Sequence, residues 1–115
     1  MDLRMELEDR DGVPVLHVFG EVDVSTAPRL RQQLVEIAAA GDASAVVDLD
    51  PVEFLDSTGL GVLVSGLKRF RTQGGDLFLV CTQRRVLKVF EITGLTKVFS
   101  THVSVDDALA AVRHS

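Results

Sequence analysis

Residues 45–63 read AVVDLDPVEFLDSTGLGVL, and this stretch determines the fold that we expect. Ala45 to Leu49 is short, apolar and rich in valine, which is typical of a central strand buried on both faces. Asp50-Pro51 breaks that strand, a loop follows to Asp56, and Ser57 stands where the N-cap of the next helix is expected. The apolar positions of this helix recur with helical spacing at Leu60, Leu63, Val64, Leu67 and Phe70.

The chain before this unit predicts a hairpin and a helix. Leu3 to Leu7 alternates apolar and charged residues, and Val13 to Phe19 forms a second strand after the turn signal Asp11-Gly12. Ser25 or Thr26 can then cap a helix that runs to about Ala40.

The chain after this unit continues the alternation of strands and helices. Leu77 to Thr82 predicts a buried strand, Arg84 to Ile92 a helix, and Lys97 to Val103 a last short strand. A capping box of Ser104 and Asp107 opens the final helix. The order β-β-α-β-α-β-α-β-α predicts an α/β fold with one mixed, mostly parallel five-stranded sheet and about four helices.

Length and composition limit the class of protein. The chain has 115 residues, which we expect to form a single domain over 1–115. Its formal net charge is −5, so we expect no nucleic-acid or membrane-surface partner and a monomer between encounters with proteins. Cys81 is the only cysteine, and no apolar run is long enough for a signal peptide or a membrane span. These features predict a cytoplasmic protein.

Few residues suggest catalysis. The three histidines, His17, His102 and His114, are scattered without the spacing of metal ligands. Gly59, Gly61 and Gly66 match neither the phosphate-binding loop nor the dinucleotide fingerprint. Ser57 is not in a nucleophile elbow, because Leu55 stands where the first glycine of that motif is required. We therefore expect no enzyme, no metal and no cofactor. A small hydrolase that uses Ser57 stays an alternative, provided that a base lies within hydrogen-bond reach.

The helix that opens at Ser57 has an unusual composition. Its three glycines each cost about 1 kcal/mol of helix stability relative to alanine, so stability alone does not explain them. Thr58, Gly61 and Ser65 share one face, whose small residues would let a partner surface approach closely. Alternatively, Gly59 and Gly61 pack under a neighbouring loop.

The run Phe54 to Leu63 resembles the signature of the STAS domain family, in its branch of bacterial anti-sigma factor antagonists. Gly20-Glu21-Val22-Asp23 with Thr26-Ala27 resembles a second recurrent stretch of the family, and the segment at Gly94-Leu95 fits a third. The resemblance covers essentially the whole chain and implies the STAS fold.

The resemblance also implies a function in the control of transcription by partner switching. Ser57 matches the serine that the family's partner, an anti-sigma factor with ATP-dependent serine kinase activity, phosphorylates. The unphosphorylated form binds that partner and frees a sigma factor; phosphorylation abolishes binding, and a serine phosphatase restores it. The expected partner-binding residues are Asp23, Ser25, Thr26, Asp56, Ser57, Thr58, Gly59, Gly61 and Ser65. The alternative is a STAS subunit that never switches, in a signalling assembly or a lipid transporter.

Such a switch needs no refolding. A phosphate adds a charge of about −1.5 to −2, which the free N–H groups at a helix N-terminus tolerate. A bound partner would instead meet a desolvated dianion beside Asp56. We therefore expect release by local repulsion.

Overall fold

A computed structural model describes residues 2–114, and Met1 and Ser115 lie outside the described residues. The predicted order of elements is confirmed, with one strand added after the first strand–helix–strand unit. The elements are β1 (Leu3–Arg10), β2 (Val13–Val22), α1 (Ala27–Ala39), β3 (Ala45–Asp48), β4 (Val52–Leu55), α2 (Ser57–Thr72), β5 (Leu77–Val80), α3 (Arg84–Ile92), the 3-10 helix η1 (Leu95–Lys97), β6 (Ser100–His102) and α4 (Val105–Arg113).

The sheet is mixed and mostly parallel, as predicted, but it has six strands and not five. Its order is β1-β2-β3-β5-β6, with β4 also beside β2. Only the pair of β1 and β2 is antiparallel among the described pairings. The long strand β2 pairs with β3 through Val15–His17 and with β4 through Gly20–Val22.

The loop predicted between Pro51 and Asp56 was wrong, because residues 52–55 form β4. Asp50-Pro51 does end β3, but the chain then extends again beside the second half of β2. In β4 the two end residues are buried and the two middle residues are exposed. This pattern lacks the alternation by which a strand is predicted from sequence.

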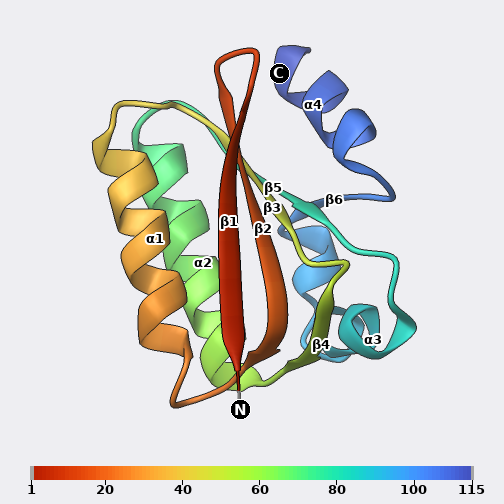
Figure 1. Ribbon diagram of the computed structural model, residues 1–115. Coiled ribbons are helices and arrows are strands. Elements are labelled where there is room, and N and C mark those ends of the chain that lie inside the picture. Colours follow the sequence, from red (N-terminus) through yellow and green to blue (C-terminus); the bar gives the residue numbers. More distant parts are fainter. Residues whose placement is uncertain (1, 115) are drawn as a thin grey trace.

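Helices cover both faces of the sheet (Figure 1). Neighbouring residues of β2 point to opposite faces: Leu16 joins a large core with side chains of α1, α2 and α3, and Val15 joins a smaller core with α4. Residues 45–49 are all buried, which confirms the central strand predicted there. Because β3 and β5 are covered on both faces, their sequences are mainly apolar and do not alternate with polar residues.

The tight turn of the β1–β2 hairpin is the one that Asp11-Gly12 predicts. Both residues have positive φ, 56° and 89°, which is the conformation of a type I′ turn. The Asp9 side chain accepts a 2.8 Å hydrogen bond from the Gly12 N–H. The turn sets the register in which Arg10 faces Val13.

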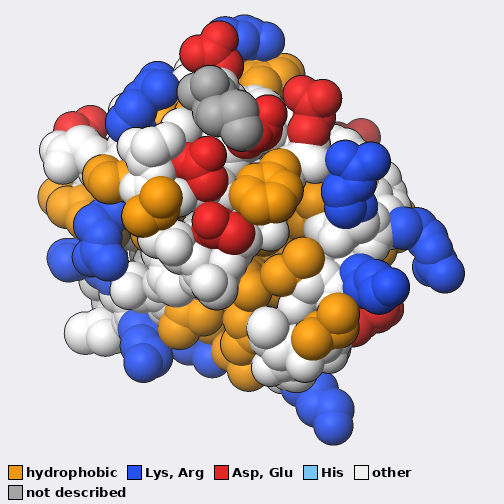
Figure 2. Space-filling model, turned by 90° about the horizontal axis from the view of Figure 1, so that it is seen from below, with side chains coloured by type: hydrophobic (Ala, Val, Ile, Leu, Met, Phe, Trp, Pro, Cys, Tyr) orange, Lys and Arg blue, Asp and Glu red, His pale blue; other side chains and the backbone are white. Residues whose placement is uncertain are grey.

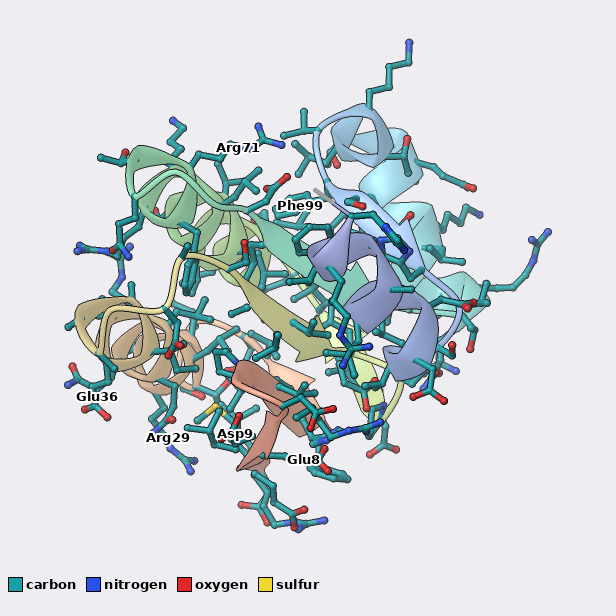
Figure 3. All side chains as sticks on the ribbon, turned by 90° about the horizontal axis from the view of Figure 1, so that it is seen from above. Glu8, Asp9, Arg29, Glu36, Arg71 and Phe99 are labelled. Atoms are coloured by element: carbon teal, nitrogen blue, oxygen red, sulfur yellow. The ribbon has the colours of Figure 1, made fainter. Side chains whose placement is uncertain are left out.

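One imidazole links three strands at the sheet surface. His17 on β2 places Nδ1 2.8 Å from Asp48 Oδ2 on β3, and Nε2 2.9 Å from Glu8 Oε1 on β1 (Glu8 is labelled in Figure 3). Ionised carboxylates only accept hydrogen bonds, so this geometry favours the protonated ring, in which both nitrogens donate. Partial burial alone would lower the pKa of His17, but the hydrogen bonds to Glu8 and Asp48 outweigh it and raise the pKa above 6.5.

This linkage predicts how stability depends on pH. The raised pKa means that His17 contributes stability fully below pH 6.5 and loses the contribution as pH rises through its folded-state pKa. We expect the free energy of unfolding in urea to be higher for the wild type than for His17→Gln. The difference should be largest at pH 6 and should shrink towards pH 9. A difference that stays constant between these pH values would contradict the bridging cation.

Candidate functional site

The candidate site lies at the carboxyl ends of β2 and β4, at the end of the molecule where α1 and α2 begin (Figure 1). Parallel strands end at the same edge, so the segments that follow β2 and β4 meet there. Residues 23–26 follow β2, and Asp56 and Ser57 follow β4.

Asp23 organises the turn between β2 and α1. Its Oδ1 accepts hydrogen bonds from the Ser25 N–H at 2.9 Å, the Ser25 hydroxyl at 2.7 Å and the Thr26 N–H at 3.1 Å. The Ser25 hydroxyl is the largest cause that lowers the pKa of Asp23 below its ordinary value, and the Thr26 and Ser25 N–H groups add to it. The turn therefore presents an ionised carboxylate at neutral pH.

Thr26 occupies the N-cap position of α1, but the predicted side-chain cap was wrong for both Ser25 and Thr26. The Thr26 hydroxyl donates to the Glu21 carbonyl at 2.8 Å and accepts from the Asp23 N–H at 2.9 Å, so it bonds within the turn and makes no hydrogen bond to the helix. Thr26 is only 5% exposed. Thr26 therefore holds the turn from its buried side, while Asp23 and Ser25 lie nearer to solvent.

The N-cap of α2 is Asp56, and the assignment of this position to Ser57 was wrong by one residue. The Asp56 backbone is extended, and its Oδ1 accepts a 3.1 Å hydrogen bond from the Gly59 N–H. The Asp56 N–H donates to the Val22 carbonyl at 3.2 Å, which continues the pairing of β4 with β2. Because a carboxylate caps a helix as well as a hydroxyl does, Asp56 takes the role and Ser57 becomes the first helical residue.

Ser57 and Thr58 are both exposed on the first turn of α2. In the part of the chain that the structure describes, the Ser57 hydroxyl has no hydrogen-bond partner. The first N–H groups of a helix lack intrahelical acceptors and carry a partial positive charge. The Ser57 hydroxyl is thus free to react and stands where an added negative charge is tolerated.

The glycines of α2 separate into two roles. A Cβ on Gly59 would lie 2.5 Å from Leu55 Cδ1 and 2.7 Å from Val22 Cγ1, so Gly59 is buried and lets the helix sit close to β2 and β4. A Cβ on Gly61 would meet nothing within 4 Å, and Gly61 is exposed. Of the two readings left open by sequence, close packing describes Gly59, and an open surface describes Gly61.

A shallow groove runs between the first turns of the two helices and is called the α1–α2 groove here. On one side it is lined by Val24, Ala27, Pro28 and Arg31, and on the other by Ser57, Thr58, Gly61 and Val62. Ser65 lies on the same face of α2 one turn beyond Gly61 and borders the next hollow along the helices.

Three residues of this end of the molecule were not predicted. Val24 is 72% exposed and Phe54 43% exposed, and Arg31 lines the groove opposite Ser57. Figure 2 shows hydrophobic side chains gathered on this end, beside a group of acidic ones. The only signal in the sequence was that Phe54 begins one of the two recognisable stretches and Val24 lies between the two parts of the other.

The hydrolase alternative finds no support in the geometry. Among residues 2–114, no histidine or carboxylate is hydrogen-bonded to the Ser57 hydroxyl, and both ring nitrogens of His17 are engaged by carboxylates. The described residues contain no cluster of three or more side chains suited to a metal ion. None of the described helices is both long and apolar enough to cross a membrane.

Together these features define a class of protein: a small mixed-sheet α/β domain with an exposed serine at the start of a helix. The STAS domain model matches residues 4–108, and the chain belongs to the STAS domain family. The chain is 37% identical over 98 residues to the anti-sigma-B factor antagonist of Bacillus subtilis, covering 85% of this chain and 89% of that protein. It is 36% identical over 95 residues to the protein of the same name from Staphylococcus aureus, covering 83% and 88%.

Solved structures agree with this assignment. An anti-sigma factor antagonist from Mycobacterium paratuberculosis superposes with a TM-score of 0.91 at 36% identity, covering 97% of this chain and 95% of that one. SpoIIAA in its unphosphorylated form superposes with a TM-score of 0.76 at 22% identity, covering 99% and 98%, which shows a shared fold. The predicted fold family is confirmed, and these relatives are named anti-sigma factor antagonists.

The two glycines provide a matched test of the packing at the site. Gly59→Ala must push Leu55 and Val22 apart, and we expect a loss of about 1–3 kcal/mol in the free energy of unfolding. Gly61→Ala adds a methyl group in open space and reduces the entropy of the unfolded chain, so we expect a gain of about 0.5–1 kcal/mol. Denaturant unfolding measures both. Equal effects of the two substitutions would show that α2 does not begin as described.

Proposed function

We propose that this chain is an anti-sigma factor antagonist whose switch is the hydroxyl of Ser57. The observation that carries the proposal is that this hydroxyl is exposed, unpaired among the described residues and one residue beyond the Asp56 cap. The proposal is also supported by relatives that bear this name and align over more than four-fifths of the chain.

In the unphosphorylated state, the partner is an anti-sigma factor with serine kinase activity, and its binding frees a sigma factor. The contact surface is the end of the molecule that carries Asp23, Ser25, Asp56, Ser57 and Thr58. The exposed side chains of Val24 and Phe54 supply apolar contact area on either side of the serine. Thr26 and Gly59 lie beneath this surface and hold it in shape.

Phosphorylation transfers the γ-phosphoryl group of ATP to Ser57 Oγ, with release of ADP and of the hydroxyl proton. The phosphate adds a charge of about −1.5 to −2 to a surface that already carries the ionised Asp23. A partner matched to a neutral hydroxyl would have to desolvate a dianion, which costs several kcal/mol unless the charge is paired. A serine phosphatase reverses the step. The chain works as a monomer in the cytoplasm and uses no cofactor.

The site of modification can be identified by mass. When the chain is incubated with ATP and the anti-sigma factor kinase of its own cell, we expect a gain of about 80 Da, one phosphate group. The gain should persist in Thr58→Ala, whose hydroxyl is the exposed neighbour, and vanish in Ser57→Ala. A gain that Ser57→Ala keeps, or that Thr58→Ala loses, would contradict the assignment to Ser57.

The effect on binding can be measured by titration calorimetry with the same anti-sigma factor. We expect Ser57→Ala to bind as well as the unmodified chain, because it stays neutral. We expect Ser57→Asp to bind at least about tenfold more weakly, a difference of about 1.4 kcal/mol. Equal affinities, together with no mass gain, would favour the alternative of a STAS subunit that never switches.

A further inference from the structure

The α1–α2 groove is lined by both Ser57 and the cationic side chain of Arg31. α1 and α2 lie side by side and both start at the same end of the molecule (Figure 1). The groove has a volume of about 360 Å³, many times the roughly 30 Å³ that a water molecule occupies in the liquid. It therefore has room for a phosphate group and its water.

Arg31 is the only charged side chain among the described residues that line this groove. It makes no hydrogen bond or ion pair with any residue from 2 to 114, whereas Arg10, Arg71 and Arg113 are all paired with carboxylates. An exposed guanidinium without a partner can turn towards a new anion without breaking an existing contact. Arginine is also the side chain whose planar fork matches two phosphate oxygens at once.

Ser57 and Arg31 line the same groove from opposite helices. Arg31 borders both the α1–α2 groove and the next hollow, which Ser65 also lines, so it lies further along the helices than Ser57. Gly61 stands four residues beyond Ser57, about 6 Å along the helix axis. Gly61 has no side chain, and a Cβ there would meet nothing within 4 Å, so Gly61 itself places no obstacle between the two groups.

We propose that Arg31 binds the phosphate of phosphorylated Ser57, so that the phosphate folds over Gly61 into the α1–α2 groove. This inference rests on the proposed function and refines it. The phosphate then occupies part of the groove and neutralises its cation, in addition to adding charge beside Asp56. The partner is then released for two reasons, because the phosphate occupies the groove and because its charge repels the partner.

The test uses chain in which phosphoserine is installed at position 57 during translation, so no kinase is needed. The second ionisation of the phosphate is followed by phosphorus-31 NMR. Arg31 favours the dianion, so we expect Arg31→Gln to raise the phosphate pKa by about 0.5 units or more. The matched control is Arg29→Gln, because Arg29 is also exposed and unpaired among the described residues but projects from the side of α1 away from α2 (Figure 3). It should change the pKa by less than about 0.2 units.

Arg31→Lys gives a second measurement, because lysine keeps the positive charge but lacks the planar guanidinium group that can bind two phosphate oxygens. We expect its phosphate pKa to lie between those of the wild type and Arg31→Gln. The proposal is overturned if Arg31→Gln titrates as the wild type does, or if Arg29→Gln shifts the pKa equally. Failure of the kinase to modify Ser57 would contradict the proposed function alone, since the titration does not depend on the kinase.

Discussion

The start of α2 depends on one hydrogen bond, from the Gly59 N–H to the Asp56 carboxylate. This cap fixes the residue at which the extended backbone of β4 turns into helix. The start of the helix in turn decides on which side of α2 each later residue lies. Ser57 and Gly61 then face solvent and the groove, while Gly59 faces β2 and β4. If the cap moved by one residue, the helix would rotate by about 100° and the serine would leave this surface.

The proposed phosphorylation of Ser57 adds charge to this edge of the sheet without changing its shape. The Asp23 turn is closed by its own hydrogen bonds, and Thr26 anchors it to the Glu21 carbonyl beneath. The cap of α2 is likewise local, and the cores lie behind both segments. A modification of Ser57 therefore meets free N–H groups and water, and no buried contact has to break. This placement supports the proposed regulation by binding without refolding.

Much of this arrangement could be predicted from the sequence, and the exceptions have physical causes. The helical spacing of Leu60, Leu63 and Leu67 and the apolar runs of β3 and β5 predict the layers correctly, because burial imposes those patterns. β4 was missed because its buried and exposed residues neither alternate nor form an apolar run. Asp56 and Ser57 are both good capping residues, so sequence alone could not choose between them. Arg31 was missed because its proximity to Ser57 arises only when α1 and α2 pack together.

The most direct test of the account compares proton–nitrogen correlation spectra of the chain with serine and with phosphoserine at position 57. A switch that acts through local charge predicts shifted amide signals in residues 23–31 and 56–65. Signals from β3, β5 and α4 should stay in place, because these elements lie away from the site. Shifts that spread through the sheet and α4 would show that phosphorylation changes the fold, and would contradict the central claim.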